Sequence, residues 1–168
     1  FGSVIGLGIA GIGCDCSELF IVVVAMMIML YTGTLDDILD LSPGLRFLVE
    51  IGTVLLLIFV GDYSLNDFHG LWGINQIPRW AAIPLTVFAV VGIINAINLI
   101  DGVDGLSSGY CILTNLLFGV MFWYVGDRVM AMLAVVAAGS LIPFFFHNVF
   151  GKSSKMFIGD GGTLVMGI

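Results

Sequence analysis

The stretch AAIPLTVFAVVGIINAINLI, residues 81–100, decides the fold class of this chain because it contains no charged side chain. A helix needs roughly 20 apolar residues to cross the hydrocarbon core of a bilayer, and this stretch has that length. Comparable stretches occupy residues 1–14, 19–35, 44–61 (interrupted by Arg46 and Glu50), 105–126 and 129–146. Helices satisfy their own backbone hydrogen bonds in lipid, and nothing here alternates with the period of a barrel strand. The sequence therefore predicts an all-α integral membrane protein, a polytopic transmembrane helix bundle with about five to six spans.

The composition agrees with a membrane protein and excludes other classes. Of the 168 residues, 60% are hydrophobic and 10% are charged, whereas about a quarter of the residues in a soluble domain are charged. Twelve acidic against five basic residues give a net charge of −7, which argues against a nucleic-acid partner. We expect one membrane domain over residues 1–168, truncated at both ends, because the chain starts without Met and stops as a new apolar run begins.

The connecting segments can be assigned to two sides of the membrane. Successive spans place their connections on alternating sides, so segments 34–43, 98–107 and 147–162 share one side. Segments 15–18, 62–79 and 127–128 share the other. The first side carries more basic residues, which by the positive-inside rule places it in the cytoplasm. The basic residues of the two sides are Arg46, Lys152 and Lys155 against Arg79 and Arg128.

Three acidic clusters fall on that first side. They are Asp36-Asp37 with Asp40, then Asp101 with Asp104, and then Asp160 within Gly159-Asp160-Gly161-Gly162. Like charges in a low-dielectric cleft repel one another and require cations, and the chain has few basic residues to supply them. Carboxylate and amide oxygens suit magnesium, which also binds substrate phosphates. The clusters therefore predict a divalent-metal site.

Each cluster also has a simpler interpretation. The Asp36-Asp37 pair could close a helix as solvated loop acids, and Asp101 and Asp104 could be turn residues beside glycines. However, polar side chains recur at every third residue around the end of an apolar span, at Asn95, Asn98, Asp101 and Asp104. Polar side chains there are costly unless they bind something. Residues 159–163 are typical of a loop whose backbone N–H groups bind phosphate.

Three motifs, which follow one another along the chain in the family's order, resemble those of the polyprenyl-phosphate N-acetylhexosamine-1-phosphate transferases. The run NAINLIDGVDGL, residues 95–106, resembles the family signature. The run GTLDD, residues 33–37, resembles its first Asp-Asp motif, and KMFIGD, residues 155–160, resembles its later Lys-x-Phe-x-Gly-Asp motif. Ile100 is more similar to the undecaprenyl-phosphate N-acetylglucosamine-1-phosphate transferases than to the muramoyl-pentapeptide branch, which usually has Thr there.

The resemblance implies a reaction and a setting. N-acetylhexosamine-1-phosphate, here GlcNAc-1-phosphate, would pass from a UDP-sugar to undecaprenyl or polyprenyl phosphate with release of UMP, in a reaction dependent on Mg²⁺ or Mn²⁺. This step would initiate cell-envelope glycan synthesis, such as that of lipopolysaccharide. The implied location is the bacterial inner membrane, with the active site facing the cytoplasm and a homodimer as the assembly.

The resemblance also implies roles for individual residues. The catalytic residues would be Asp36 and Asp37, which orient or deprotonate the lipid phosphate. The metal would be bound by Asp160 and, through its amide oxygen, by Asn98. The substrate-binding residues would be Asn95, Asp101, Asp104, Lys155 and Phe157.

Within the substrate-binding set, Asp104 and Phe157 would bind uracil by hydrogen bonds and by stacking, with Asp101 nearby. Lys155 would face phosphate.

Two other functions also fit parts of the sequence. Asp36-Asp37-Ile-Leu-Asp40 matches the Asp-Asp-x-x-Asp motif of prenyl-diphosphate enzymes, which include intramembrane prenyltransferases. A transporter could use membrane aspartates as an ion route, but it would place acids near the middle of spans and on both sides. The acidic clusters at span ends on one side favour an interfacial enzyme.

Overall fold

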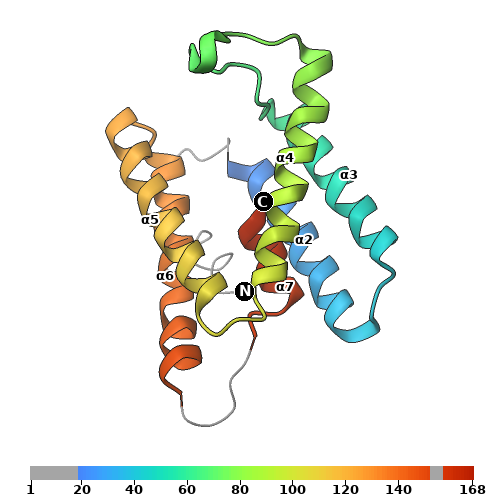
Figure 1. Ribbon diagram of the computed structural model, residues 1–168, viewed down its shortest axis with the longest axis vertical. Helices are drawn as coiled ribbons and strands as arrows, with labels where there is room; N and C mark the ends of the chain where they lie inside the picture. The colour runs from blue at the N-terminus through green and yellow to red at the C-terminus, as the bar shows by residue number, and fades with distance from the viewer. Residues whose placement is uncertain (1–18, 152–156) are drawn as a thin grey trace.

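The computed structural model describes residues 19–151 and 157–168, which form helices joined by short connections (Figure 1). The helices are α2 (Leu19–Leu39), α3 (Pro43–Gly61), α4 (Arg79–Ile100), α5 (Leu106–Val125), α6 (Arg128–Phe150) and α7 (Asp160–Gly167), with a 3₁₀ turn η1 (Leu71–Gly73). Five of them, α2 to α6, are long and apolar enough to cross a membrane. The prediction of an all-α polytopic membrane protein is confirmed. The stretch 1–14, a sixth candidate span, lies outside the described residues.

The helix ends follow local sequence signals. Pro43 begins α3, where its missing N–H costs nothing, and α6 begins after Asp127, whose carboxylate accepts a hydrogen bond from Met130 N–H at 3.0 Å. The α2 helix continues past the charge-free stretch to Leu39. The Asp36-Asp37 pair therefore lies on the last turn of a helix and not in a loop as the simpler interpretation expected.

The connections alternate between the two ends of the bundle, as the span parity predicted. In Figure 1 the α2–α3 and α4–α5 connections lie at the bottom with the end of α6 and the start of α7. The α3–α4 connection with η1 and the α5–α6 turn lie at the top. We call the bottom end the acidic end because it holds all three acidic clusters of the sequence.

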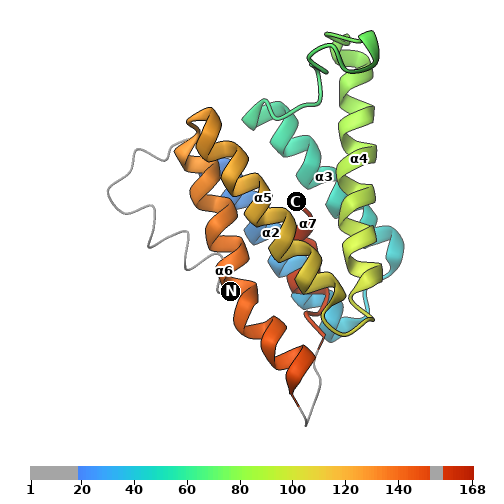
Figure 2. The same cartoon turned by 60° about the vertical axis from the view of Figure 1, so that its left-hand side comes forward.

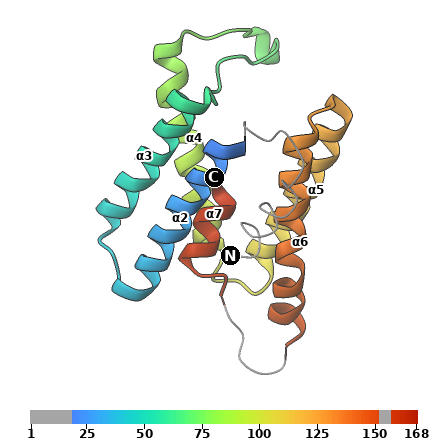
Figure 3. The ribbon, with the colours of Figure 1, turned by 180° about the vertical axis from the view of Figure 1, so that it is seen from behind.

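The short α7 helix packs between α2 and α4 and builds the main core (Figure 3). Met29 of α2, Ile94 of α4 and Leu164 of α7 are fully buried in this core. The backbones of α2 and α7 touch, because a Cβ atom on Gly33 would lie 2.4 Å from Gly161 Cα. This close approach places the start of α7 beside the last turn of α2.

The α5 and α6 helices form an antiparallel hairpin that packs mainly on itself (Figure 2). A small core of Ile97, Cys111 and Leu141 joins the hairpin to α4. At the acidic end Gly105 has a φ of +73°, and a Cβ there would lie 2.4 Å from Val149 Cγ2. Glycine at this position therefore permits both the turn into α5 and its contact with α6.

Candidate active site

A cavity of about 290 Å³ opens at the acidic end, where α2, α4 and α7 meet. One carboxylate from each acidic cluster lines it, although the clusters are far apart in the sequence. The lining residues are Asp37, Asn98, Asp101, Gly102, Phe157, Gly159 and Asp160.

Asp37 reaches this cavity from the last turn of α2 and caps the start of α7. Its Oδ1 accepts a hydrogen bond from Asp160 N–H at 3.0 Å, and its Oδ2 accepts one from Gly161 N–H at 3.4 Å. Gly159 has a φ of +79°, and a Cβ there would lie 3.0 Å from Asp37 Oδ2. The N–H groups that the sequence suggested for phosphate therefore bind a carboxylate of the protein itself, where the helix dipole also stabilises negative charge.

Asn98 and Asp160, the two predicted metal ligands, are in direct contact. Asn98 Nδ2 donates a hydrogen bond to Asp160 Oδ1 and another to Thr163 Oγ1, the second at 2.9 Å. Burial raises the pKa of the Asp160 carboxyl, the neighbouring Asp36 acts in the same direction, and the hydrogen bond from Asn98 opposes them. A cation at the cavity would stabilise the charged form of Asp160 and so offset the free-energy cost of burying that charge.

Asp101 links the α4–α5 turn to the loop before α7. Its Oδ1 accepts a hydrogen bond from the Ser107 hydroxyl, and its Oδ2 accepts one from Gly159 N–H at 3.3 Å. Phe157 lines the same cavity with 64% of its surface exposed. Asp104 lies in the same turn as Asp101, but it is exposed and is not among the residues that line the cavity.

The remaining predicted residues lie elsewhere. Asp36 is buried, pairs with Arg46 Nη1 at 3.2 Å and accepts a hydrogen bond from Leu41 N–H at 2.9 Å. Asn95 donates to Glu50 Oε2 at 2.6 Å. Neither Asp36 nor Asn95 is among the residues that line the cavity, and Lys155 lies outside the described residues. Their functional roles stay predictions.

Two charged residues behind the cavity were not selected from the sequence. Arg46 contacts Asp36 and lies 3.8 Å from Asp160, and Glu50 is fully buried beside Arg46. The sequence does indicate that these two residues are unusual, because both interrupt an apolar span where a charged side chain is costly. Charge patterning alone assigns both residues to the span and does not connect them to a site.

The donor atoms at the cavity fit a magnesium-type ion. The described residues contain no group of three or more His, Cys, Asp or Glu side chains that could hold a metal by themselves. Magnesium does not require such a cage, since it binds through one or two carboxylates, substrate phosphates and water. Asp37, Asp101, Asp160 and Asn98 offer oxygen ligands at one cavity, the set that suits Mg²⁺ or Mn²⁺.

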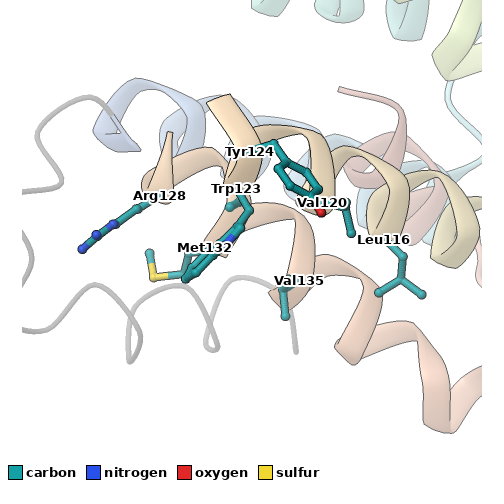
Figure 4. Close-up of a pocket in the computed structure, with 9 residues that line it drawn as sticks. Leu116, Val120, Trp123, Tyr124, Arg128, Met132 and Val135 are labelled. Carbon is teal, nitrogen blue, oxygen red and sulfur yellow. The ribbon is translucent and has the colours of Figure 1, made fainter. Parts of the chain in front are cut away.

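Two larger cavities among the described residues lack this donor set. A cavity of about 570 Å³ lies on the α5–α6 hairpin and is lined by apolar side chains together with Trp123, Tyr124 and Arg128 (Figure 4). Another, of about 470 Å³, lies among α2, α3, α4 and α6 and is mostly apolar. None of the described residues that line these two cavities is acidic.

Comparison with known proteins identifies the family. The family model described as Glycosyl transferase family 4 matches residues 19–168. The chain belongs to this family. The match covers all the motifs from which the resemblance was inferred.

Relatives in two branches of the family are similar to the chain. It is 33% identical over 168 residues to a probable undecaprenyl-phosphate N-acetylglucosaminyl 1-phosphate transferase of Bacillus subtilis (strain 168), a match that covers 99% of the chain and 46% of that protein. It is 26% identical over 148 residues to the undecaprenyl-phosphate alpha-N-acetylglucosaminyl 1-phosphate transferase of Escherichia coli (strain K12), covering 83% and 39%. It is 32% identical over 175 residues to a phospho-N-acetylmuramoyl-pentapeptide-transferase of Synechococcus sp. (strain JA-3-3Ab), covering 97% and 50%. The chain thus spans half or less of the length of these relatives.

Proposed function

We propose that this chain carries part of the catalytic centre of a membrane transferase that moves GlcNAc-1-phosphate from UDP-GlcNAc to undecaprenyl phosphate. The main support is that Asp37, Asp101 and Asp160, from three separate motifs, line one cavity at one end of the spans. Family membership and the names of the two N-acetylglucosaminyl 1-phosphate transferases support the same reaction class. Ile100 in the Asn-Leu-Ile-Asp run supports GlcNAc as the sugar.

In the proposed reaction a phosphate oxygen of the lipid attacks the phosphorus that carries the sugar. A bond forms between that oxygen and the phosphorus, the bond from the phosphorus to the UMP oxygen breaks, and UMP leaves. Both reactants are anions, so the site must screen their repulsion and align them. A bound Mg²⁺ would neutralise charge on the diphosphate.

The residues at the cavity divide these tasks by position. Asp160 would bind the metal together with the amide oxygen of Asn98, whose Nδ2 already donates to Asp160. Asp37, held in place by two backbone N–H groups, would orient the lipid phosphate at the cavity edge. A phosphate monoester has a second pKa near 6, so its deprotonation needs little help from Asp37.

The nucleotide would occupy the side of the cavity formed by Asp101 and Phe157. The exposed ring of Phe157 is available for stacking with uracil, and Asp104, in the same turn as Asp101, would hydrogen-bond to the base. Asp36, which pairs with Arg46, would help Asp37 to orient the lipid phosphate. Lys155 would face phosphate. The acidic end would face the cytoplasm of a bacterial inner membrane, with a homodimer as the assembly.

The prenyltransferase alternative receives less support. Its motif requires Asp36, Asp37 and Asp40 to share one diphosphate–metal site. Asp36 is buried against Arg46, Asp40 is exposed, and only Asp37 of the three is among the residues that line the cavity.

The proposed function is tested by nucleotide release from the full-length protein in detergent. We expect UMP from UDP-GlcNAc only when both undecaprenyl phosphate and Mg²⁺ are present, and little UMP from UDP-glucose under the same conditions. Release from UDP-N-acetylmuramoyl-pentapeptide instead would correct the sugar and keep the reaction class. An active preparation of the protein that releases no UMP from any UDP-sugar would reject the transferase proposal.

A further inference from the structure

Arg46 lies directly behind the cavity, and every nitrogen of its guanidinium group has a partner. Nη1 lies 3.2 Å from Asp36 Oδ2, and Nη2 donates to Asn95 Oδ1 at 3.2 Å. Nε lies 3.5 Å from Glu50 Oε1. Nη1 is also 3.8 Å from Asp160 Oδ1, at the wall of the cavity. The orientation of the guanidinium plane is therefore set by partners on all sides.

Glu50 is the buried member of this network. It lies on the span α3 with 0% of its surface exposed. Its Oε2 accepts a hydrogen bond from Asn95 Nδ2 at 2.6 Å, whereas no described residue donates one to Oε1, which faces Arg46 Nε. A buried ion pair is often no more stabilising than apolar residues of similar size. Fold stability alone therefore gives little reason for a carboxylate here, and its contacts point to Arg46.

Asn95 joins Glu50 and Arg46 to the neighbouring span. Its Nδ2 also donates to the Val91 carbonyl at 2.9 Å, and its Oδ1 accepts from Arg46. Both ends of the amide are thus engaged inside the protein, and Asn95 is not among the residues that line the cavity. These contacts fix the Glu50–Arg46 pair of α3 against α4.

We propose that Glu50 and Asn95 are positioning residues that hold the Arg46 guanidinium in one orientation between Asp36 and Asp160. They act through Arg46 and do not touch substrate. A guanidinium is a planar fork that can bind all these partners at once, whereas a lysine ammonium is a compact point charge. A positive charge fixed in this way keeps the field at Asp160 preorganised for the approach of anionic substrates. This inference rests on the proposed transferase function and adds a buried supporting layer to it.

Glu50→Gln in the full-length protein tests the role of the buried carboxylate. It keeps the shape and an acceptor for Asn95 but removes the charge that faces Arg46. We expect kcat for UMP release to fall roughly 10- to 100-fold, the usual cost of removing a supporting partner of a catalytic group, with a nearly unchanged KM for UDP-GlcNAc. Thr53→Val is the matched control, since Thr53 is also buried on α3 and donates only to the Val49 carbonyl in the same helix. A Glu50→Gln enzyme with the kcat of wild type would overturn the proposal.

A double-mutant cycle separates positioning from a general effect on folding. If Glu50 acts through Arg46, adding Glu50→Gln to an Arg46→Gln enzyme should change kcat very little. The full loss appearing again on that background would overturn the proposal.

Arg46→Lys provides a second test that does not depend on the folding of the Glu50 variant. It keeps the positive charge and loses the planar fork, so we expect a kcat loss similar to that of Glu50→Gln, with an unchanged elution volume and thermal midpoint. Wild-type kcat in Arg46→Lys would show that orientation is unimportant. A wild-type protein without activity would instead reject the transferase function, so the two failures are distinguishable.

Discussion

Asp36 and Asp37 are neighbours in the sequence, yet only Asp37 lines the cavity. Consecutive helical residues point about 100° apart, so the two carboxylates meet different partners near the start of α7. Asp37 binds the N–H groups of Asp160 and Gly161, and Asp36 is buried against Arg46. The sequence could indicate that the pair is functional, but the partition between its members depends on where α7 packs.

Whether the other predicted site residues line the cavity also depends on which residues pack beside them. Because polar side chains recur at every third residue around the end of a span, the sequence predicts that Asn98 and Asp101 face a pocket, and both line the cavity. The same spacing also suggested Asn95 and Asp104, which do not. Asn95 lies one turn deeper, where Arg46 and Glu50 bind it, and Asp104 lies beyond the helix end in an exposed turn.

Asp160→Asn is the sharpest test at the level of one residue. It removes the charge beside Asn98 and keeps the size of the side chain. We expect kcat for UMP release to fall roughly 10²- to 10³-fold, as when one electrostatic stabiliser is lost from an active site. Asp62→Asn, the same exchange at the opposite end, should retain wild-type kcat, because Asp62 is exposed. A nearly wild-type Asp160→Asn enzyme would remove this residue from the proposed mechanism.

At the scale of elements, the charge pattern located the spans but ended α2 too early. The charge-free run stops at Leu35, whereas helix α2 stops at Leu39, before Asp40 with its φ of 49° and before Pro43. Charge marks where a helix leaves the apolar core of the membrane, and backbone signals mark where it ends. The position of α7 could not be predicted, because it depends on the close contact between Gly33 and Gly161, which are far apart in the sequence.

Gly33→Ala tests the contact between α2 and α7. The new methyl group would overlap the Gly161 backbone, so the helices must separate and the start of α7 must move away from Asp37. We expect the free energy of unfolding to fall by about 1–3 kcal/mol, the typical cost of overpacking, together with a loss of UMP release. Thermal unfolding in detergent measures the first effect.

Gly92→Ala is the control for that substitution. Apart from the adjoining backbone of its own helix, no atom of the described residues lies within 4 Å of the position its Cβ would take, so its thermal midpoint should equal or exceed that of wild type. Equal midpoints for Gly33→Ala and wild type would contradict the close approach of α2 and α7.

For the whole molecule, the number of spans is enough to predict which segments lie at the same end of the bundle. Each crossing reverses the chain, so parity assigns the ends, and the acidic clusters indeed share one end (Figure 1). Parity does not specify which helices are neighbours. The separate α5–α6 hairpin and the central α7 depend on side-chain packing that charge patterns do not encode.

Cysteine labelling in intact cells tests this arrangement. In a background without the native cysteines, we expect cysteines at the exposed positions Asp40, Gly102 and Phe150 to share one accessibility to an impermeant maleimide. Cysteines at His69 and Arg128 should show the opposite accessibility. With the acidic end in the cytoplasm, the first set should be labelled only after the cells are permeabilised. Different accessibilities within the first set would contradict the predicted alternation of the connections between the two sides of the membrane.

Binding of Mn²⁺ to the full-length protein, followed by electron paramagnetic resonance, tests most directly whether Asp160 and Asn98, from two distant motifs, hold a divalent cation at the acidic end. We predict that the wild-type protein removes Mn²⁺ from the free signal and that excess Mg²⁺ restores that signal. Asp160→Asn should weaken this binding at least about tenfold, whereas Asp62→Asn should not change it. Equal Mn²⁺ affinity in the wild type and Asp160→Asn would contradict a metal site at the acidic end.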